Sequence, residues 1–224
     1  MKKTICVTGA TGFVGQGVIP MLLEAGYQVR ILVRSERSLA KLNFIPQQQR
    51  AALTTVFGDP CNSDDIVRAL DGSDVLLHLV GIRRHEIKRT GKTYRDIDVG
   101  SAIAAREALK QTGKKRIILL SAANIGNSEY VRCKAEAEAA VAQAGLDYTI
   151  FRPSFITAPG QQWPIIMSPV LWFFGLLPGH FGDVARRAGN ITRRQLANGF
   201  INAIQDDSTI GKIFDVPGIR TLGN

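Results

Sequence analysis

The sequence predicts an α/β fold, a doubly wound parallel β-sheet with helices on both of its faces. Short apolar runs of strand length alternate with longer amphipathic runs of helix length through residues 1–155. The run at 73–81 is almost continuously apolar, which is typical of a strand buried on both faces. Strands that alternate with helices form right-handed βαβ units, so we expect the strands to be parallel.

Each expected element is bounded by turn or capping residues. Strands are expected at residues 4–9, 27–34, 53–59, 73–81, 114–122 and 147–154. Helices are expected at residues 13–26, 62–72, 98–113 and 128–145. The first helix ends at Gly26 and contains Pro20, where we expect a kink. The second begins at the capping residue Asn62, and the last is rich in alanine, the best helix former.

Three glycines follow the first strand at regular spacing, in TGATGFVG (8–15). Gly9 allows a sharp turn, Gly12 lets a pyrophosphate approach the backbone, and Gly15 lets the helix pack close to the strand. The N–H groups at the helix start, around Thr11, Phe13 and Val14, would then face the phosphates. The alternative is a glycine-rich turn without a ligand. The strand–turn–helix context favours a dinucleotide, and therefore a Rossmann-like sheet in the order 3-2-1-4-5-6.

Tyr130 and Lys134 are the expected catalytic pair. Residues four apart lie on one face of a helix, so the ammonium of Lys134 is expected to lower the pKa of the Tyr130 phenol. Such a tyrosine can exchange a proton with a substrate oxygen while hydride moves at a nicotinamide. The alternative is an ordinary exposed pair.

The end of the second strand predicts the cofactor. Proteins of this fold that prefer NAD carry an acidic residue there, whereas this chain has Arg34, with Arg37 close by. We therefore expect NADP(H) to be preferred, with NAD(H) as the alternative cofactor. Two solvated surface arginines are the alternative interpretation.

Together these motifs resemble the short-chain dehydrogenase/reductase superfamily. The GxxGxxG spacing, the YxxxK motif, GD at 58–59 and FRPSFITAPG at 151–160 carry the resemblance. It implies that Asp59 contacts the adenine and that Ser121, which ends the fifth strand, is catalytic. It also implies cofactor contacts at Val80, Gly81, Lys134, Arg152 and Pro153.

Within the superfamily, the chain most resembles the atypical group of the nucleotide-binding accessory subunit of respiratory complex I. LVGIRR, YRDIDVGSAIAAREA and YVRCKAEAEAAV match that group. Asp98 stands where typical members have an active-site Asn. Two functions therefore stay open: an NADP(H)-dependent oxidoreductase or epimerase-like enzyme, and a structural or regulatory protein that binds the dinucleotide without turnover.

Composition narrows the choice of partners. The 224 residues carry a formal net charge of +9, which favours anionic ligands. No basic tail or aromatic-interleaved basic motif is present, so we expect a dinucleotide and a small-molecule substrate rather than nucleic acid. Three isolated cysteines, without CxxC or metal-ligand spacing, indicate a cytoplasmic protein without a metal. No signal peptide is expected.

The remaining segments give weaker expectations. His78 is expected to be a hydrogen-bonded core histidine, and the basic segment at 83–92 a loop that is either solvated or receives an anion. Residues 156–224 are expected to form a small C-terminal lobe over the nicotinamide end of a dinucleotide-binding domain, 1–155. Its apolar stretch at 163–181 is expected to be buried or to line a pocket, with contact with a membrane as the alternative, and the resemblance to the complex I subunit adds contact with a respiratory complex as a further alternative. The aromatic residues of this stretch suggest a hydrophobic or ring-bearing substrate: Trp163, Trp172, Phe173, Phe174 and Phe181.

Overall fold

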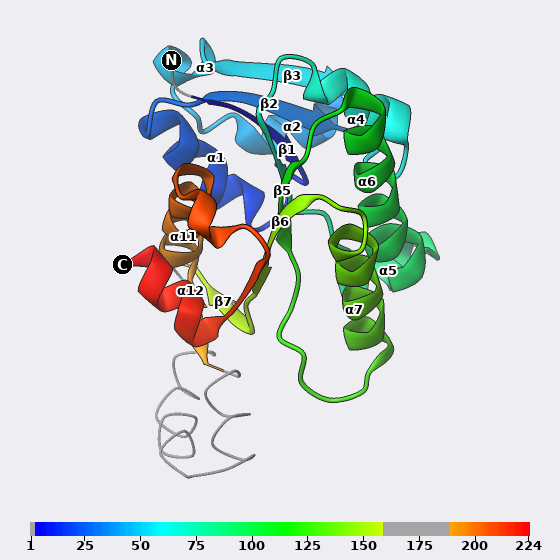
Figure 1. Ribbon diagram of the computed structural model, residues 1–224. Helices are drawn as coiled ribbons and strands as arrows, with labels where there is room; N and C mark the ends of the chain where they lie inside the picture. The colour runs from blue at the N-terminus through cyan, green and yellow to red at the C-terminus, as the bar shows by residue number, and fades with distance from the viewer. Residues whose placement is uncertain (1–2, 159–188) are drawn as a thin grey trace.

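The computed structural model describes residues 3–158 and 189–224. Its centre is a parallel sheet of seven strands in the order β3-β2-β1-β4-β5-β6-β9 (Figure 1). The predicted order of the first six strands is confirmed, and β9 extends the sheet beyond β6. The strands are β1 (Thr4–Thr8), β2 (Gln28–Val33), β3 (Leu53–Phe57), β4 (Val75–His78), β5 (Arg116–Leu120), β6 (Asp147–Arg152) and β9 (Lys212–Asp215).

Helices cover both faces of this sheet. One face carries α1 (Gly15–Glu24), α11 (Arg193–Gln205) and α12 (Val216–Gly223), as Figure 1 shows. The other face carries α4 (Ser63–Leu70), α6 (Gly100–Thr112) and α7 (Glu129–Ala142). The connection from β2 to β3 contains the short α2 (Glu36–Leu39), η1 (Ala40–Leu42) and α3 (Gln47–Arg50). The expected helix at 13–26 is therefore α1, which runs through Pro20 without ending there.

The core consists of two layers, one on each side of the sheet. Successive side chains of a strand point to opposite faces, so Ile5 and Val7 join the cluster under α1 and α11, whereas Cys6 joins the cluster under α4 and α6. This is why the strands of the sheet have apolar residues at successive positions rather than alternate ones.

Two segments differ from their predictions. The basic segment 83–92, expected to be a loop, contains a helix, α5 (Arg84–Thr90). The carboxylate of Glu86 accepts a hydrogen bond from the backbone N–H of Arg83 at its start, and Gly91, at φ +70°, ends it. The helix expected at 98–113 is preceded by a five-residue π-helix, η2 (Arg95–Val99), which runs directly into α6.

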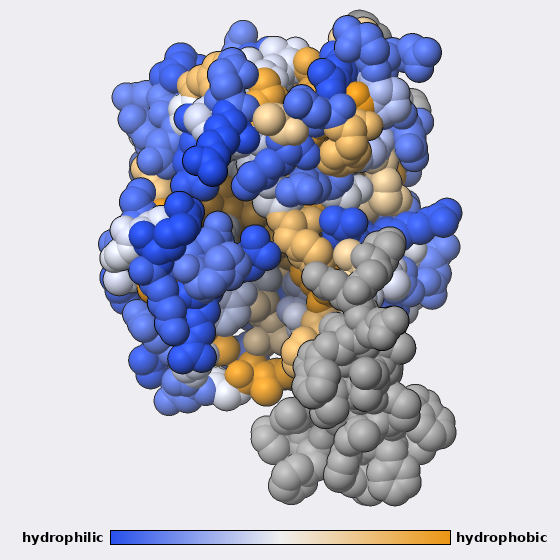
Figure 2. All heavy atoms as spheres, turned by 180° about the vertical axis from the view of Figure 1, so that it is seen from behind, coloured by the Kyte–Doolittle hydropathy of each residue, from blue (hydrophilic) through white to orange (hydrophobic). Residues whose placement is uncertain are grey.

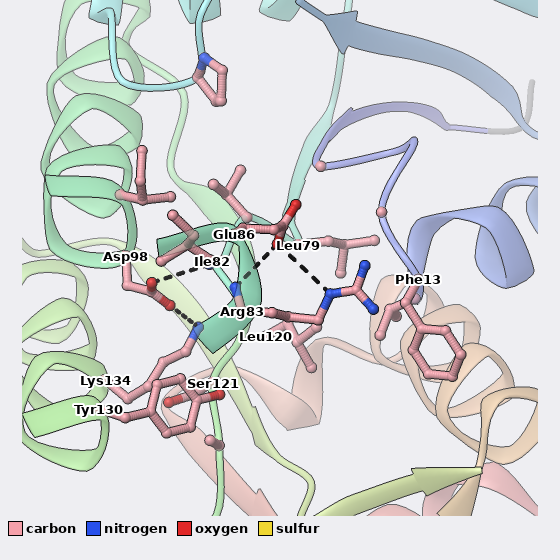
Figure 3. Close-up of a pocket in the computed structure, with 18 of the residues that line it drawn as sticks. Phe13, Leu79, Ile82, Arg83, Glu86, Asp98, Leu120, Ser121, Tyr130 and Lys134 are labelled. Carbon is pink, nitrogen blue, oxygen red and sulfur yellow. Dashed lines mark hydrogen bonds and ion pairs between the residues drawn. The ribbon is translucent and has the colours of Figure 1, made fainter. Parts of the chain in front are cut away.

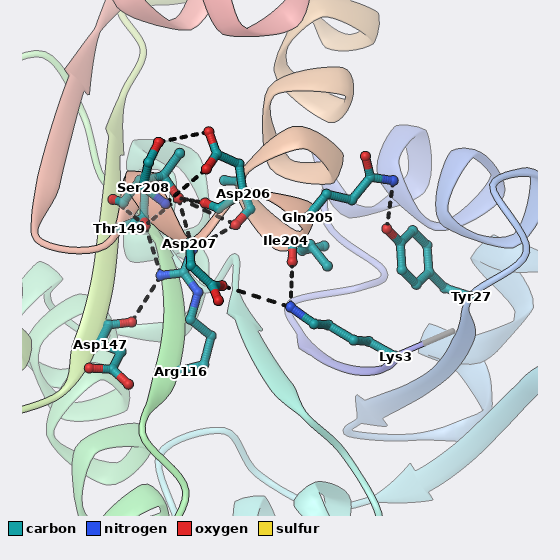
Figure 4. Close-up of polar contacts among 12 residues, drawn as sticks. Lys3, Tyr27, Arg116, Asp147, Thr149, Ile204, Gln205, Asp206, Asp207 and Ser208 are labelled. Atoms are coloured by element: carbon teal, nitrogen blue, oxygen red, sulfur yellow. Dashed lines mark hydrogen bonds and ion pairs between the residues drawn. The ribbon is translucent and has the colours of Figure 1, made fainter. Parts of the chain in front are cut away.

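The C-terminal residues are tied to the sheet. The guanidinium of Arg116 on β5 donates to Thr149 Oγ1 at 2.8 Å and to the carbonyl of Ala203 on α11 (Figure 4). Lys3 donates to the carbonyl of Ile204 at 2.8 Å. These contacts join α11 to the amino end of β1, β5 and β6, so that β9 and α12 continue the same layered structure.

The region predicted to be a C-terminal lobe is described only in part. A second, two-stranded parallel sheet joins β7 (Phe155–Thr157) to β8 (Asn190–Thr192). The apolar stretch 163–181, with the aromatic residues predicted to select the substrate, lies outside the described residues. Among the helices of residues 3–158 and 189–224, none has the length and apolar character needed to cross a membrane.

Candidate functional site

A cavity of about 800 Å³ opens at the carboxyl ends of the central strands. Ligands of open α/β sheets bind in such a crevice, and this volume is within the range of small-molecule sites, about 300–1,000 Å³. Figure 2 shows hydrophobic groups gathered along a hollow between hydrophilic flanks. The loop after β1, the ends of β2 and β3, α5, η2 and the start of α7 all contribute to the lining.

The glycine loop forms one wall of the cavity. Gly9 has φ +78°, and a Cβ there would lie 2.6 Å from the carbonyl oxygen of Leu79. The N–H of Gly12 donates to the carbonyl of Gly9 at 3.0 Å, which closes the turn. A Cβ at Gly15 would collide with the carbonyl of Ala10, so only glycine lets α1 pack here.

Most of the loop faces the cavity. Gly9, Thr11, Gly12, Phe13 and Val14 line it, whereas Gly15 does not, because it is the first residue of α1 and packs against the turn. The first N–H groups of a helix have no intrahelical partner and bind phosphate readily. The loop therefore fits the pyrophosphate of a dinucleotide.

Basic residues gather where β2 and β3 end. Arg34 lines the cavity after β2, and Asp59 lines it after β3. The segment after β3 is held by two hydrogen bonds: Asp59 N–H donates to Asp65 Oδ2 at 2.7 Å, and Cys61 N–H donates to Asp59 Oδ1 at 2.9 Å. Lys41, Arg89 and Lys92 also line the cavity, and the sequence analysis did not single them out.

Arg37, expected close to Arg34 as a further contact for NADP(H), lies in α2. The hydroxyl of Ser35 accepts a hydrogen bond from the Ser38 N–H and caps α2. Residue 37 is therefore on a short exposed helix and is not part of the cavity lining.

Tyr130, Lys134 and Ser121 come together at the other end of the cavity (Figure 3). Ser128 caps α7, so Tyr130 lies in its first turn and Lys134 one turn later. The ammonium of Lys134 lies 5.9 Å from the centroid of the Tyr130 ring. Ser121 is buried, and its Oγ has no hydrogen-bond partner among the described residues. A buried hydroxyl without a partner fits a site that a polar ligand group completes.

The expected pKa shift of Tyr130 is wrong in direction. Burial raises the pKa of the phenol, and this effect exceeds the lowering by the Lys134 charge. The carboxylate of Asp98 raises the pKa further. Asp98 is close because its Oδ1 forms an ion pair with Lys134 Nζ at 2.6 Å, with both side chains buried.

Some of the residues at the ends of β4 and β6 line the cavity, and others do not. Val80 and Gly81 line the cavity, and so does Pro153. Arg152 is not part of the lining, and its cofactor contact stays a prediction. Its Nε donates to Glu138 Oε1 at 3.0 Å, so the guanidinium is held by a carboxylate of α7, which raises its pKa.

His78 is a core histidine, as the sequence analysis expected. Its Nδ1 lies 2.8 Å from Thr8 Oγ1 and its Nε2 lies 3.1 Å from Ser101 Oγ. Among the described residues no cluster of three or more His, Cys, Asp or Glu could hold a metal ion.

The start of α5 reaches over the glycine loop. Arg83 lines the cavity, and its guanidinium extends toward Phe13, as Figure 3 shows. Glu86 Oε2 lies 3.6 Å from Arg83 Nε and steadies this arrangement. Arg84, which belongs to the same basic segment expected to be solvated or to receive an anion, is not part of the lining.

The family follows from a comparison with family models, in which a model described as NAD(P)H-binding matches residues 9–207. The chain belongs to this NAD(P)H-binding family. The match includes the glycine loop and both ends of the cavity. A nicotinamide dinucleotide is therefore the cofactor class of this family member.

Curated relatives of this NAD(P)H-binding chain agree with the sequence resemblance. It is 27% identical over 216 residues, 95% of its length, to subunit 9 of the NADH dehydrogenase [ubiquinone] 1 alpha subcomplex of mouse mitochondria. It is 29% identical over 162 residues, 71% of its length, to ceramide reductase of Caulobacter vibrioides. The chain spans about half the length of these relatives, 56% and 48%.

Solved structures share the fold of this family member. A Bacillus halodurans protein described as a candidate NAD-dependent epimerase/dehydratase has a TM-score of 0.72 and 22% identity, with 99% of this chain and 98% of that chain covered. Vestitone reductase from alfalfa has a TM-score of 0.66 and 21% identity, with 95% and 76% covered. At such identities the comparison establishes the fold alone.

Proposed function

We propose that the protein is an NADP(H)-dependent oxidoreductase or epimerase-like enzyme that acts on a carbonyl or hydroxyl group. The observation that carries this proposal is a single cavity with a glycine loop in one wall and Tyr130, Lys134 and Ser121 together at one end. This arrangement matches a dinucleotide lying along the strand ends, with a substrate beside Tyr130.

The residues have separate roles in this proposal. A bound nicotinamide supplies or accepts hydride at the substrate carbon. In the reductive direction the Tyr130 hydroxyl donates its proton to the substrate oxygen, which leaves an alcohol and a tyrosinate that regains its proton from solvent. Ser121 Oγ, which is buried and unpaired, donates a hydrogen bond to the same oxygen.

The basic residues at the other end support a preference for NADP(H). Arg34 and Asp59 line the cavity where β2 and β3 end, and Lys41, Arg89 and Lys92 add positive charge to its lining. A guanidinium can form paired, charge-assisted hydrogen bonds with a 2′-phosphate, whereas the hydroxyl of NAD(H) offers no negative charge. Calorimetric titration with NADP⁺ and NAD⁺ tests this preference, and equal affinities would contradict it.

The cavity wall near Tyr130 suggests the substrate class. Ile82, Leu120, Ile125, Phe155 and Ile156 line the cavity. Such a lining suits a hydrophobic or ring-bearing substrate. The name of one similar protein, ceramide reductase, supports reduction as the reaction class.

A binding protein without turnover is the second candidate. The similarity to the mouse NADH dehydrogenase subunit, the buried Asp98–Lys134 ion pair and the raised pKa of Tyr130 favour it. Contact with a respiratory complex belongs to this candidate. The absorbance of NADPH, followed with a panel of hydrophobic aldehydes and ketones, separates the two. Consumption of NADPH with any member supports the enzyme, and binding without consumption across the panel supports the second candidate.

The three cysteines bear on location. Cys6, Cys61 and Cys133 are all free thiols in the structure. The pKa of Cys61 is raised to about 11, mainly by burial, so this thiol stays protonated at neutral pH. Unpaired thiols are typical of a reducing compartment. This supports the cytoplasm as the proposed location.

A further inference from the structure

Asp98 is enclosed between three elements next to the proposed proton donor. Its side chain is fully buried, at 0% exposure, within the π-helix η2. Its Oδ1 lies 2.6 Å from Lys134 Nζ on α7, and its Oδ2 accepts a hydrogen bond from the backbone N–H of Ile82 at 3.2 Å. The carboxylate is therefore fixed at both oxygens.

The segment after β4 closes the third side of this pair. A Cβ at Gly81 would lie 3.2 Å from Asp98 Oδ1 and 3.3 Å from Lys134 Nζ. Glycine therefore leaves the ammonium and the carboxylate the space to meet. Figure 3 shows the ion pair at the edge of the cavity, next to the ring of Tyr130.

The titratable groups that act on Tyr130 within the described part of the chain come from η2, including its N-cap residue, and from α7. The ring of Tyr94, at the start of η2, lies 5.1 Å from its ring between centroids. Lys134 and Asp98 are the charged groups that act on its phenol, with opposite signs, and Tyr94 is the other titratable group that does so. His78 also feels the Lys134 charge, but it is held by Thr8 and Ser101 in the core.

We propose that Asp98 is a positioning residue, which fixes the ammonium of Lys134 and offsets its charge, so that Lys134 acts on Tyr130 as half of a neutral pair. The importance of Tyr130 for the reaction rests on the proposed function. The geometry of the Asp98–Lys134 pair is independent of that function, and it predicts the titration of Tyr130 in the protein without substrate.

The physical consequence is that the Tyr130 phenol keeps its proton to a higher pH than it would beside an uncompensated Lys134. A cation close to a phenol favours the phenolate, and a carboxylate fixed at 2.6 Å from that cation cancels much of its field. An amide at position 98 keeps the shape and can still accept from the N–H of Ile82, but it leaves the ammonium uncompensated.

The test is a titration of Tyr130 by the ultraviolet absorbance of tyrosinate. The chain has four tyrosines, so the Tyr130 signal is the difference between each protein and the same protein with Tyr130→Phe. We expect Asp98→Asn to move the midpoint of this difference to lower pH. A midpoint that stays in place or rises would overturn the proposal.

Two further variants keep the test decisive. Glu136→Gln removes another carboxylate, one that is bound to Arg95 at 2.7 Å and partly exposed, and it should leave the midpoint unchanged. The double variant Asp98→Asn/Lys134→Met replaces the pair by neutral side chains, a change that buried ion pairs often tolerate. The Tyr130 midpoint of the double variant should be close to that of the wild type. This variant tests the proposal if Asp98→Asn alone does not fold. A clear rise of the midpoint in the double variant would show that Lys134 acts as an uncompensated cation.

The outcomes separate this inference from the proposed function. A lowered midpoint in a protein that consumes no NADPH with any carbonyl compound would leave the inference standing and remove the proposed function. An active enzyme in which Asp98→Asn leaves the midpoint unchanged would support the proposed function and overturn the inference.

Discussion

His78 Nδ1, at the end of β4, lies 2.8 Å from Oγ1 of Thr8, the last residue of β1 before the glycine loop. Its other nitrogen lies 3.1 Å from Ser101 Oγ on α6. A neutral imidazole satisfies both contacts, with one nitrogen as donor and the other as acceptor. Burial first, and the Lys134 charge second, lower the pKa of His78 to about 3.

This lowered pKa predicts a loss of stability in acid. Between about pH 6.5 and pH 3 the unfolded chain binds a proton at His78 that the folded protein does not bind. The free energy of unfolding therefore falls as the pH falls through this window, by up to about 1.4 kcal/mol per pH unit for one proton. Urea denaturation at several pH values measures this slope.

A pair of variants isolates the contribution of His78. His78→Gln is expected to reduce the slope, because it removes the titrating group while keeping a polar side chain at the site. His85→Gln is the control, since His85 is exposed on α5. Equal slopes in the wild type and His78→Gln would show that other groups cause the acid sensitivity.

Arg34 and Arg37 form a matched pair for cofactor preference, because only Arg34 lines the cavity. A charged hydrogen bond contributes about 1.5–3 kcal/mol, so one good contact predicts a roughly ten- to hundred-fold preference for NADP⁺ over NAD⁺. Arg34→Asp should reverse this order, since its carboxylate repels the 2′-phosphate and accepts from the 2′-hydroxyl. Arg37→Asp makes the same change of charge and should keep the wild-type ratio. Calorimetry measures the ratio of the dissociation constants for NADP⁺ and NAD⁺ in each variant. An unchanged ratio in Arg34→Asp would refute the contact of Arg34 with the 2′-phosphate.

Arg83 and Arg84 are neighbours in sequence, but only Arg83 lines the cavity. We expect Arg83→Ser to slow the association of NADPH at low ionic strength and Arg84→Ser to slow it less. The difference should shrink at physiological salt, where exposed charges are screened within about 8 Å. Stopped-flow fluorescence measures the association rates. Identical rates for both variants would mean that α5 affects the ligand only through its total charge.

The sequence was sufficient for the parts of the site that depend on local pattern. The glycine loop follows from the spacing of three glycines between a strand and a helix, and the order of the first six strands follows from the Rossmann-like fold that this loop indicates. Tyr130 and Lys134 were found because four residues make one helical turn.

The parts that depend on tertiary contacts were not predictable. Arg152 is the last residue of β6, and only the fold brings Glu138 to its guanidinium. The burial that raises the pKa of Tyr130 above the lowering by Lys134, and the ion pair of Lys134 with Asp98 across 36 positions of sequence, both depend on tertiary packing. The helix at 84–90 had a readable signal in Glu86 and Gly91, but its basic composition also suited a loop. The pairing of β9 with β6 depends on the C-terminal residues returning to the sheet edge.

The most direct test of the proposed chemistry is the turnover of Tyr130→Phe with a carbonyl compound that the wild type reduces. The substitution removes only the hydroxyl, and Tyr130 lies in the first turn of α7, away from the glycine loop. We predict that NADPH consumption falls by about 10²-fold or more, the usual contribution of a general acid, while the affinity for NADPH stays within a few-fold. Consumption at the wild-type rate in Tyr130→Phe would contradict the assignment of Tyr130 as the proton donor.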